Sequence, residues 1–382
     1  MRRIFAVTLT ILVAACSSAP PTLKPLPTLD SAPTVSPAAA AAPVTATPEP
    51  TVAPLPTVTP SPDTVLCPLS GLPVSKSVLA ARRPLMVQLG NSGPERPQFG
   101  LAQADLIFET LSEGGITRFS AVYLCQDAQD IAGVRSARLI NLQIIPIFDA
   151  ILAHVGASAA VLELIERDVR IRDSRLDYFR NNPGFTLQPE RRRPPFDVFT
   201  STQALWDAAR SRNVPMPGNP VPEIKTSSNV PPGGLNVRAV TIHHHSSYWV
   251  RWKWDDEASV WTRHISSDVN AAGDVPHLDA ATARVLTAKN IVIIRAQHKQ
   301  TDIIEDTLGS RSQNVEITGA SGDAIFLRDG QMFKGKWKRD KVNEWFTFTL
   351  ADGKPYELHP GNTYIHFYDL ESPFFPIDVV TR

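Results

Sequence analysis

Three arginines are the residues whose types and spacing point most directly to chemistry. Arg135 and Arg138 flank Ser136 at a predicted helix start, and Arg118 begins a predicted strand after a glycine turn. The first turn of a helix leaves backbone N–H groups unpaired and favours an anion. Each guanidinium offers a planar fork that suits a phosphate or a carboxylate. If the three side chains point to one place, they form an anion-binding site.

The acidic residues that precede these arginines leave two interpretations open. Asp105, Glu109 and Glu113 can pair with the arginines as structural ion pairs. In an enzyme that acts on a phosphorylated substrate, the arginines would clamp the phosphate or pyrophosphate instead. Glu109 or Asp105 would then place a metal ion or activate a nucleophile.

His154 and Ser158 form a second candidate, where a predicted strand turns into a helix. A serine at such a turn can be a nucleophile with a nearby histidine as its base. Ser158 is explained more simply as a helix N-cap, and Ala160 stands where a full nucleophile elbow needs glycine. We therefore keep His154 as a candidate ligand-binding residue and assign no catalytic residue.

Histidines and tryptophans gather in the second half of the chain. On a strand, His243 and His245 share a face as two zinc ligands would, but no cysteine or third histidine follows at a standard spacing. We predict neither a metal site nor a cofactor. The tryptophans can form a carbohydrate-stacking platform, but packing in the core is favoured; they are Trp249, Trp252, Trp254 and Trp261.

The elements that must position the arginines alternate between strands and helices in the first half. Short apolar runs predict strands, and apolar residues at helical spacing predict helices. This alternation is typical of a sheet covered by helices. The predicted strands are 85–89, 105–109, 119–125 and 150–155, and the predicted helices are 136–146, 158–167 and one that begins at Ser201.

The second half is predicted to be mostly β. Short strands alternate with Asp-Gly turns at 329–330 and 352–353, and a turn over 255–259 predicts a hairpin. The fold class is therefore α+β, with an N-terminal α/β sandwich-type domain followed by a smaller mostly-β domain. The predicted domains are 67–215 and 237–382, joined by a linker over 216–236 that is rich in Pro, Gly, Ser and Asn.

The N-terminus predicts where the protein resides. Two arginines, a short apolar run and small residues lead to Cys16, which is the layout of a secretory signal peptide over 1–16. A cysteine at the cleavage position resembles a bacterial lipobox, in which that cysteine is lipidated. The following 17–66 are Pro-, Thr- and Ala-rich and are predicted to form a disordered tether. We expect an extracytoplasmic protein that is anchored to the cell membrane through its lipid.

Charge and cysteine content exclude some classes of protein. The 38 Lys and Arg residues balance the 38 Asp and Glu residues, so we predict no nucleic-acid partner. The three cysteines are too few for a disulfide scaffold. Beyond Cys16 there remain Cys67 and Cys125, which can bridge in an oxidising compartment or remain as one exposed and one buried thiol.

Several motifs resemble those of the YerB-like bacterial lipoproteins. They include Arg83–Val87, Asn91, Arg96–Gln98, Ala104–Asp105, Glu109, Glu113–Phe119 and Gly133–Arg138 in the first half, and Asn290–Val292, Gly335–Trp337 and Pro360–Gly361 in the second. The resemblance implies an envelope lipoprotein with an N-terminal and a C-terminal domain of unsettled biochemical role. It adds four residues to the candidate ligand-binding set, Asn91, Arg96, Gln98 and Thr117. Where the family commonly has Pro-His-Asn, this chain has Pro195-Phe196-Asp197.

Three functions follow from these observations. The first is a non-catalytic, lipid-anchored envelope protein that binds a cell-wall polymer or a membrane protein partner. The second is an enzyme that acts on a phosphorylated envelope substrate held by the arginines. The third is a lipoprotein that senses a small anion in a cleft between its two domains.

Overall fold

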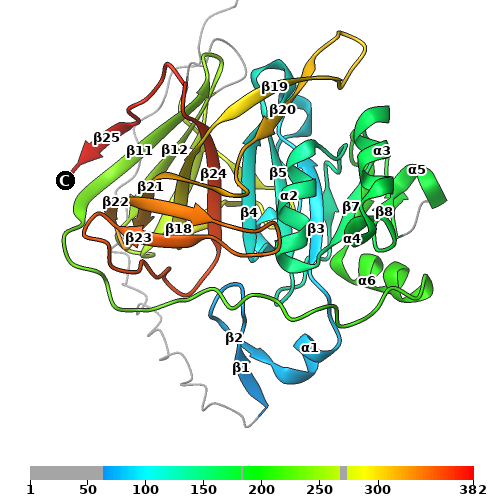
Figure 1. Ribbon diagram of the computed structural model, residues 1–382, viewed down its shortest axis with the longest axis horizontal. Coiled ribbons are helices and arrows are strands. Elements are labelled where there is room, and N and C mark those ends of the chain that lie inside the picture. The colour runs from blue at the N-terminus through cyan, green and yellow to red at the C-terminus, as the bar shows by residue number, and fades with distance from the viewer. Residues whose placement is uncertain (1–62, 182–183, 267–272) are drawn as a thin grey trace, which may run out of the picture. The chain divides into compact units, whose positions relative to one another are not determined.

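The computed structural model describes residues 63–181, 184–266 and 273–382 (Figure 1). The predicted signal peptide and nearly all of the predicted tether lie outside the described residues. Within these ranges, no helix is long and apolar enough to cross a membrane.

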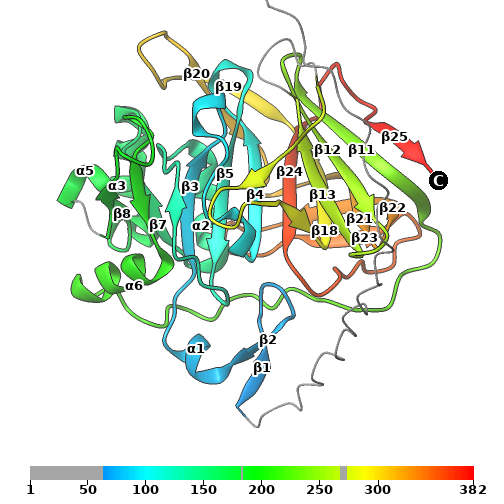
Figure 2. The ribbon, with the colours of Figure 1, turned by 180° about the vertical axis from the view of Figure 1, so that it is seen from behind.

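One large mixed sheet of sixteen strands runs through the described chain (Figures 1 and 2). The order along its main path is β14 (Val275–Pro276), β13 (Val260–Ile265), β12 (Tyr248–Asp255), β11 (Leu235–His245), β22 (Gln331–Arg339), β21 (Ala320–Arg328), β18 (Asn290–Ala296), β24 (Thr363–Asp369), β4 (Leu106–Leu111), β5 (Thr117–Tyr123), β3 (Leu85–Gly90), β7 (Ile151–His154) and β8 (Leu176–Asp177). Off this path, β17 (Thr287–Ala288) pairs with β13, β23 (Thr347–Leu350) with β22 and β25 (Asp378–Thr381) with β11.

Strand β24 joins the two halves of the chain. It pairs in parallel with β18 on one side and with β4 on the other, which places His366 opposite Glu109. Strands from the first and the second half therefore belong to one sheet. The predicted domain boundary within 216–236 stays a prediction.

The described α-helices all lie in the first half, which confirms an α+β fold with a mostly-β second half. They are α1 (Lys76–Ala80), α2 (Leu139–Phe148), α3 (Ala159–Arg167), α4 (Val169–Arg172), α5 (Tyr178–Asn181) and α6 (Thr202–Ser211). Helix α6 begins at Ser201, whose hydroxyl accepts a hydrogen bond from the Ala204 N–H. It buries the stripe Leu205, Trp206 and Ala209.

Smaller sheets and 3₁₀ turns complete the fold. The two-stranded sheets pair β1 (Thr64–Leu66) with β2 (Pro73–Ser75), β15 (Leu278–Asp279) with β16 (Arg284–Val285), and β19 (His298–Ile304) with β20 (Arg311–Val315). A three-stranded sheet contains β6 (Ile131–Ala132), β10 (Val198–Thr200) and β9 (Thr186–Leu187), and the 3₁₀ turns are η1 (Gly93–Glu95), η2 (Leu101–Gln103) and η3 (Glu113–Gly115). The loop between β19 and β20 extends outward in both views (Figures 1 and 2).

The central strands are buried on both faces, which explains their continuous apolar runs. In β4, Ile107 packs into the core on one face, while Leu106 and Phe108 pack into the core on the other. Because side chains alternate along a strand, Glu109 lies on the face of Ile107, and Thr110 lies on the face of Phe108. The polar residues of β4 and β5 are divided between the two faces in the same way.

A disulfide joins Cys67, which follows β1, to Cys125, which follows β5. Asp105 lies beside it, and its carboxylate accepts the backbone N–H groups of Leu124 and Cys125 at 2.8 and 2.9 Å. Burial raises the pKa of Asp105 to about 6, although these hydrogen bonds work against the increase. The carboxylate of Asp105 is thus engaged at this end of β5, away from the arginines.

Candidate functional site

A buried ion pair connects the two halves of the chain. Arg263 NH2 of β13 donates to Glu109 Oε1 of β4 at 3.0 Å. Arg263 NH1 lies 2.9 Å from Glu109 Oε2 as an ion-pair contact, and neither side chain is exposed. The hydroxyl groups of Thr117 and Tyr248 also donate to Glu109 Oε1, at 2.7 and 3.1 Å. The Glu109 carboxylate is therefore held from β5 as well as from the second half of the chain.

Electrostatics keep this pair ionised. Burial on its own works to raise the pKa of Glu109, but the charge of Arg263 outweighs it and lowers the pKa well below its usual range. Burial likewise opposes the charge of Arg263, yet Glu109 raises the pKa of the guanidinium overall. Each ion stabilises the charged form of the other.

Further predicted residues surround this pair. Asn91 Nδ2 donates to Thr117 Oγ1 and to Tyr248 OH, at 2.7 Å each. Arg263 Nε donates to His277 Nδ1 at 3.0 Å, and His277 Nε2 donates to Gln98 Oε1 at 2.7 Å. We call this set the junction network; its members are Asn91, Gln98, Glu109, Thr117, Tyr248, His244, Arg263, His277 and His366.

Arg96 borders the junction network. Its Nε and NH2 groups donate to the Asn91 carbonyl at 2.9 and 2.8 Å, and its guanidinium lies over the Tyr248 ring. The structure thus brings five predicted candidates together, namely Asn91, Arg96, Gln98, Glu109 and Thr117. It also adds partners from the second half that sequence reasoning missed, because each lies more than 130 residues away from Glu109 or Gln98.

Two histidines give this network the donor set of a metal centre. Glu109, His244 and His366 each direct a ligand atom to one place, with all three atoms within 4.8 Å of one another. His366 Nδ1 is 3.3 Å from Glu109 Oε2 and 3.2 Å from His244 Nε2. A carboxylate with two imidazoles is a known zinc-binding combination.

The hydrogen bonds around His366 do not fit a metal ion. Trp252 Nε1 can only donate, and it donates to His366 Nε2 at 3.1 Å. Burial lowers the pKa of His366 well below its usual value, so the neutral ring carries its proton on Nδ1. That nitrogen is the atom that a metal would need. It donates toward Glu109 and His244 instead, and Glu109 is already paired with Arg263.

On the opposite face of β4 and β5 lies a second ion-paired group. Arg138, which precedes α2, makes a two-pronged contact with Glu113 of η3, with Nε at 2.7 Å and NH2 at 2.8 Å. Arg118 NH2 is 3.6 Å from Glu113, and Arg118 Nε donates to Ser112 Oγ at 3.0 Å. Glu305, from the β19–β20 loop, is 3.5 Å from Arg138 Nε. We call Glu113, Arg118, Arg138 and Glu305 the arginine–glutamate cluster.

Several polar atoms in and beside this cluster find no hydrogen-bond partner among the described residues. They are Arg118 NH1, both carboxylate oxygens of Glu305 and the Ser312 hydroxyl. Arg118 and Ser312 line a cavity of about 10 Å³ together with Gln88, Ser112 and Ile140, which is room for one water molecule. Burial, followed by the charge of Arg138, lowers the pKa of Arg118 to about 10.

The glycines of η3 allow this arrangement. Gly114 and Gly115 both have φ of +72°, a backbone region that other residues rarely adopt. The turn reverses the chain between β4 and β5 and brings Glu113 back toward Arg118 and Arg138. Burial works to raise the pKa of Glu113, but Arg138 and Arg118 lower it overall.

The third predicted arginine has a different carboxylate partner. Arg135 Nε is 2.8 Å from Glu95, and its guanidinium lies over the Phe196 ring. Ser136 lies half-buried between Arg135 and Arg138. Two of the three arginines therefore share a site, while Arg135 lies beside it and is held by Glu95.

His154 lies apart from both groups. It is the last residue of β7, and its Nδ1 donates to the Gly156 carbonyl at 2.8 Å. Burial lowers its pKa. Ser158 is the N-cap residue of α3, and no hydrogen bond joins it to His154 among the described residues. Within the described chain, Ser158 therefore takes the N-cap position without a capping hydrogen bond to its side chain, and it forms no serine–histidine pair with His154.

The histidine run and the tryptophans of the second half pack or bond locally. His243 lies 2.9 Å from Asp378 of β25, while His245 contacts Ser247 at 2.8 Å. Trp252 and Trp261 have no exposed surface, which confirms core packing for these two rings. They leave no flat aromatic surface for a sugar.

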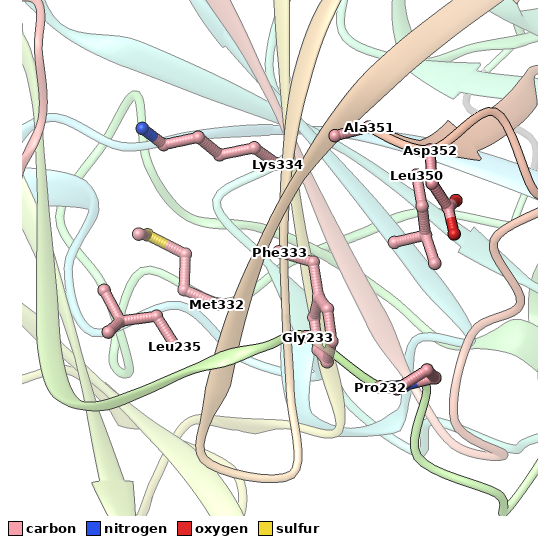
Figure 3. Close-up of a pocket in the computed structure, with 9 residues that line it drawn as sticks. All are labelled: Pro232, Gly233, Leu235, Met332, Phe333, Lys334, Leu350, Ala351 and Asp352. Carbon is pink, nitrogen blue, oxygen red and sulfur yellow. The ribbon is translucent and has the colours of Figure 1, made fainter.

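Two apolar hollows lie elsewhere. One, of about 350 Å³, is lined by Leu235, Met332, Phe333 and Leu350, with the exposed Lys334 and Asp352 beside them (Figure 3). Another, of about 380 Å³, lies against Arg96 and His277, whose polar atoms already bond within the protein. Neither hollow borders the unpaired atoms of the arginine–glutamate cluster, which is therefore the candidate site.

Comparisons with known proteins match a family model to each half of the chain. The N-terminal domain of "Protein of unknown function (DUF3048)" matches residues 69–215, and the DUF3048 C-terminal domain matches residues 238–365. The "Putative lipoprotein YerB" of Bacillus subtilis (strain 168) is 29% identical over 301 residues, which cover 78% of this chain and 85% of the relative. The crystal structure of the YerB protein from Bacillus subtilis has a TM-score of 0.69 at 24% identity and covers 83% of this chain and 100% of that one. That likeness shows the fold.

Proposed function

The chain belongs to the DUF3048 family, which matches both of its halves in order, and on this basis we propose that it is a lipid-anchored, extracytoplasmic protein that binds an acidic cell-wall polymer. The lipobox-like sequence that ends at Cys16 and the similarity to a relative named as a lipoprotein support the anchored location. The proposed binding site is the arginine–glutamate cluster.

One observation carries this assignment to the cluster. Its Arg118 guanidinium is buried and charged, yet NH1 finds no hydrogen-bond partner within the described chain. An unsatisfied buried charge is costly, and protein structures keep such groups chiefly where a water or a ligand completes them. Phosphate and carboxylate groups, which acidic wall polymers carry, are the natural partners of a guanidinium.

The structure lends less support to the second function, an enzyme that acts on a phosphorylated envelope substrate. Glu109, which would place a metal or activate a nucleophile, lies on the opposite face of the sheet and is bound to Arg263. Asp105 is bound by backbone N–H groups at the end of β5. The two carboxylates that would take these roles therefore lie apart from the cluster, and the carboxylates within it, Glu113 and Glu305, are ion-pair partners of its arginines.

A sensor that closes around a small anion is also less well supported. Such a protein needs two halves that can separate about a hinge. Here β24 of the second half pairs directly with β4 of the first half. The ion pair of Glu109 and Arg263, which has no exposed surface, crosses the same boundary, and separating it would leave two unpaired charges.

The test is binding of the full-length lipoprotein to isolated cell walls. We expect the wild-type protein to sediment with walls, and to lose at least tenfold in affinity after acid extraction of the phosphate-bearing polymers. Arg118→Gln is expected to show the same loss. Arg311→Gln, which removes a half-exposed arginine that pairs with the fully exposed Asp302, is the matched control and should bind normally.

Two results would count against the proposal. Binding that survives both acid extraction and Arg118→Gln would remove the acidic polymer as the ligand. Sedimentation only when membrane proteins are present would point to a protein partner instead.

A further inference from the structure

We infer that the arginine–glutamate cluster binds a single carboxylate or phosphate group, and that the β19–β20 hairpin closes this site by placing the Glu305 carboxylate where the acidic group of the ligand binds. The inference rests on the proposed function, because it specifies how that binding site is controlled. It makes Glu305 an internal competitor of the ligand.

The position of Glu305 is the first observation. Its side chain has no exposed surface, and the nearest cation, Arg138 Nε, is 3.5 Å from its Oε2. That nitrogen already donates to Glu113 at 2.7 Å. Neither oxygen of Glu305 accepts a hydrogen bond within the described chain. A buried carboxylate that merely stabilised the fold would be expected to have such bonds.

The charge balance is the second observation. With the hairpin in place, two arginines, Arg118 and Arg138, face two carboxylates, Glu113 and Glu305, and the cluster has no net charge. Without Glu305, the same two arginines face one carboxylate, which leaves one positive charge. The open site therefore matches a ligand group with a single negative charge.

Unpaired donors are the third observation. Arg118 NH1 and the hydroxyl of Ser312, a residue only 1% exposed, are both buried and unsatisfied in the described chain. Both residues line the cavity of about 10 Å³, which is too small for a carboxylate or a phosphate. An acidic group can thus reach Arg118 only if the hairpin moves.

The hairpin is attached in a way that permits this movement. Strands β19 and β20 form a sheet of their own. At the base, Gln143 Nε2 donates to the Val315 carbonyl at 2.7 Å, and the His298 N–H donates to Asp369 at 3.3 Å. At the other end, Leu308 is 89% exposed. The base is fastened to the body, and the loop approaches the cluster through Glu305.

The experiment measures the affinity of the full-length lipoprotein in detergent for two probes, inorganic phosphate and acetate, by isothermal titration at fixed ionic strength. We expect weak binding by the wild type and at least tenfold tighter binding by Glu305→Gln, which keeps the shape of the side chain but removes its charge. Asp302→Asn is the matched control, because it removes an equal charge from the exposed face of the same hairpin. It should bind like the wild type. Whichever probe gains more affinity identifies the preferred acidic group.

A second measurement needs no substitution. Saturating phosphate should speed hydrogen exchange of the hairpin loop amides in the wild-type protein, since the ligand displaces Glu305. Unchanged exchange, or equal affinity of the wild type and Glu305→Gln for both probes, would overturn the inference. An equal gain in Asp302→Asn would overturn it too, because it would show a general charge effect.

The two proposals fail separately. If Arg118→Gln abolishes binding to cell walls while Glu305→Gln leaves it unchanged, the binding site stands and the internal competitor is wrong. If Arg118→Gln has no effect on wall binding, the proposed function itself is wrong.

Discussion

The junction network and the arginine–glutamate cluster lie on opposite faces of β4 and β5, and both pair arginine with glutamate. They differ in how completely the charges are bonded. Glu109 Oε1 accepts hydrogen bonds from Thr117, Tyr248 and Arg263, and Oε2 lies 2.9 Å from Arg263 NH1 as an ion-pair contact without a hydrogen bond. Neither oxygen of Glu305 accepts a hydrogen bond in the described chain, and its nearest cation is 3.5 Å away. Glu305 therefore has the larger shortfall, which is the one expected where a ligand binds.

Position in the fold explains this difference. The junction network is enclosed by strands of both halves, since Glu109 lies opposite His366 in the β4–β24 pair. Six of its named members are strand residues of the sheet itself, namely Glu109, Thr117, His244, Tyr248, Arg263 and His366. The arginine–glutamate cluster is closed on one side by the β19–β20 loop, through Glu305, and not by a strand of the sheet. The same residue types thus serve stability in one place and are available for binding in the other.

The largest effect is expected from a substitution that breaks the junction network. Arg263→Met leaves Glu109 buried without its counter-ion, which should lower the free energy of unfolding by about 3–5 kcal/mol. Urea unfolding of the purified protein measures this change. The double variant Glu109→Met/Arg263→Met should recover most of the loss, because it removes both buried charges. Arg118→Met in the other group should change stability by less than about 1 kcal/mol, since it also removes an unsatisfied donor.

Equal losses for Arg263→Met and Arg118→Met would erase the distinction between the two groups. A double variant as unstable as Arg263→Met would mean that the packing of these side chains, rather than their charge, holds the junction.

An intermediate effect is expected from pH, through His244 of the junction network. Burial lowers its pKa to about 4, below the value of about 6.5 in the unfolded chain. The unfolded state therefore binds a proton first as pH falls. The stability due to neutral His244 is complete above pH 6.5 and is lost as pH falls toward 4. By linkage, the loss is about 2 kcal/mol between pH 7 and pH 5.

Urea unfolding at pH 7 and pH 5 measures this effect, and His244→Gln should lose about 2 kcal/mol less stability than the wild type over that interval. Asp105 changes the free energy of unfolding with pH in the opposite direction. Its pKa in the folded protein is raised to about 6, above the unfolded value of about 3.9. Its contribution is full below pH 3.9 and is lost as pH rises through 6. Identical pH profiles for the wild type and His244→Gln would show that His244 titrates normally and is not part of the buried network.

The sequence was sufficient for the elements that pack on the central sheet. The apolar runs that predict strands at 85–89 and 150–155 correspond to β3 and β7, and Ser201 does begin α6. Burial on both faces imposes a continuous apolar pattern on such strands, and this pattern can be read without the structure. The sequence also suggested Glu113 as an ion-pair partner of the arginines, because it lies close to Arg118 along the chain.

The contacts that define the two sites could not be predicted in the same way. Arg263 lies 154 residues from Glu109, and their pairing depends on how the two halves share one sheet. The β19–β20 hairpin is mostly polar, with residues such as Lys299, Gln300 and Asn314. Since it is outside the main sheet, it lacks the apolar alternation that reveals strands. The sequence therefore gave no sign of Glu305.

The smallest expected effect concerns the metal-like group Glu109, His244 and His366. Because Trp252 donates to His366 Nε2, the proton of the neutral ring is on Nδ1, and this excludes the ring as a ligand at that atom. We expect protein purified without chelator to contain less than about 0.1 zinc per chain by mass spectrometry, and chelation to shift the melting temperature by less than about 1 °C. Zinc at about one equivalent in the wild type, lost in His366→Gln, would contradict this expectation. The junction network would then be a metal site, and it could no longer be contrasted with the arginine–glutamate cluster as a purely structural group.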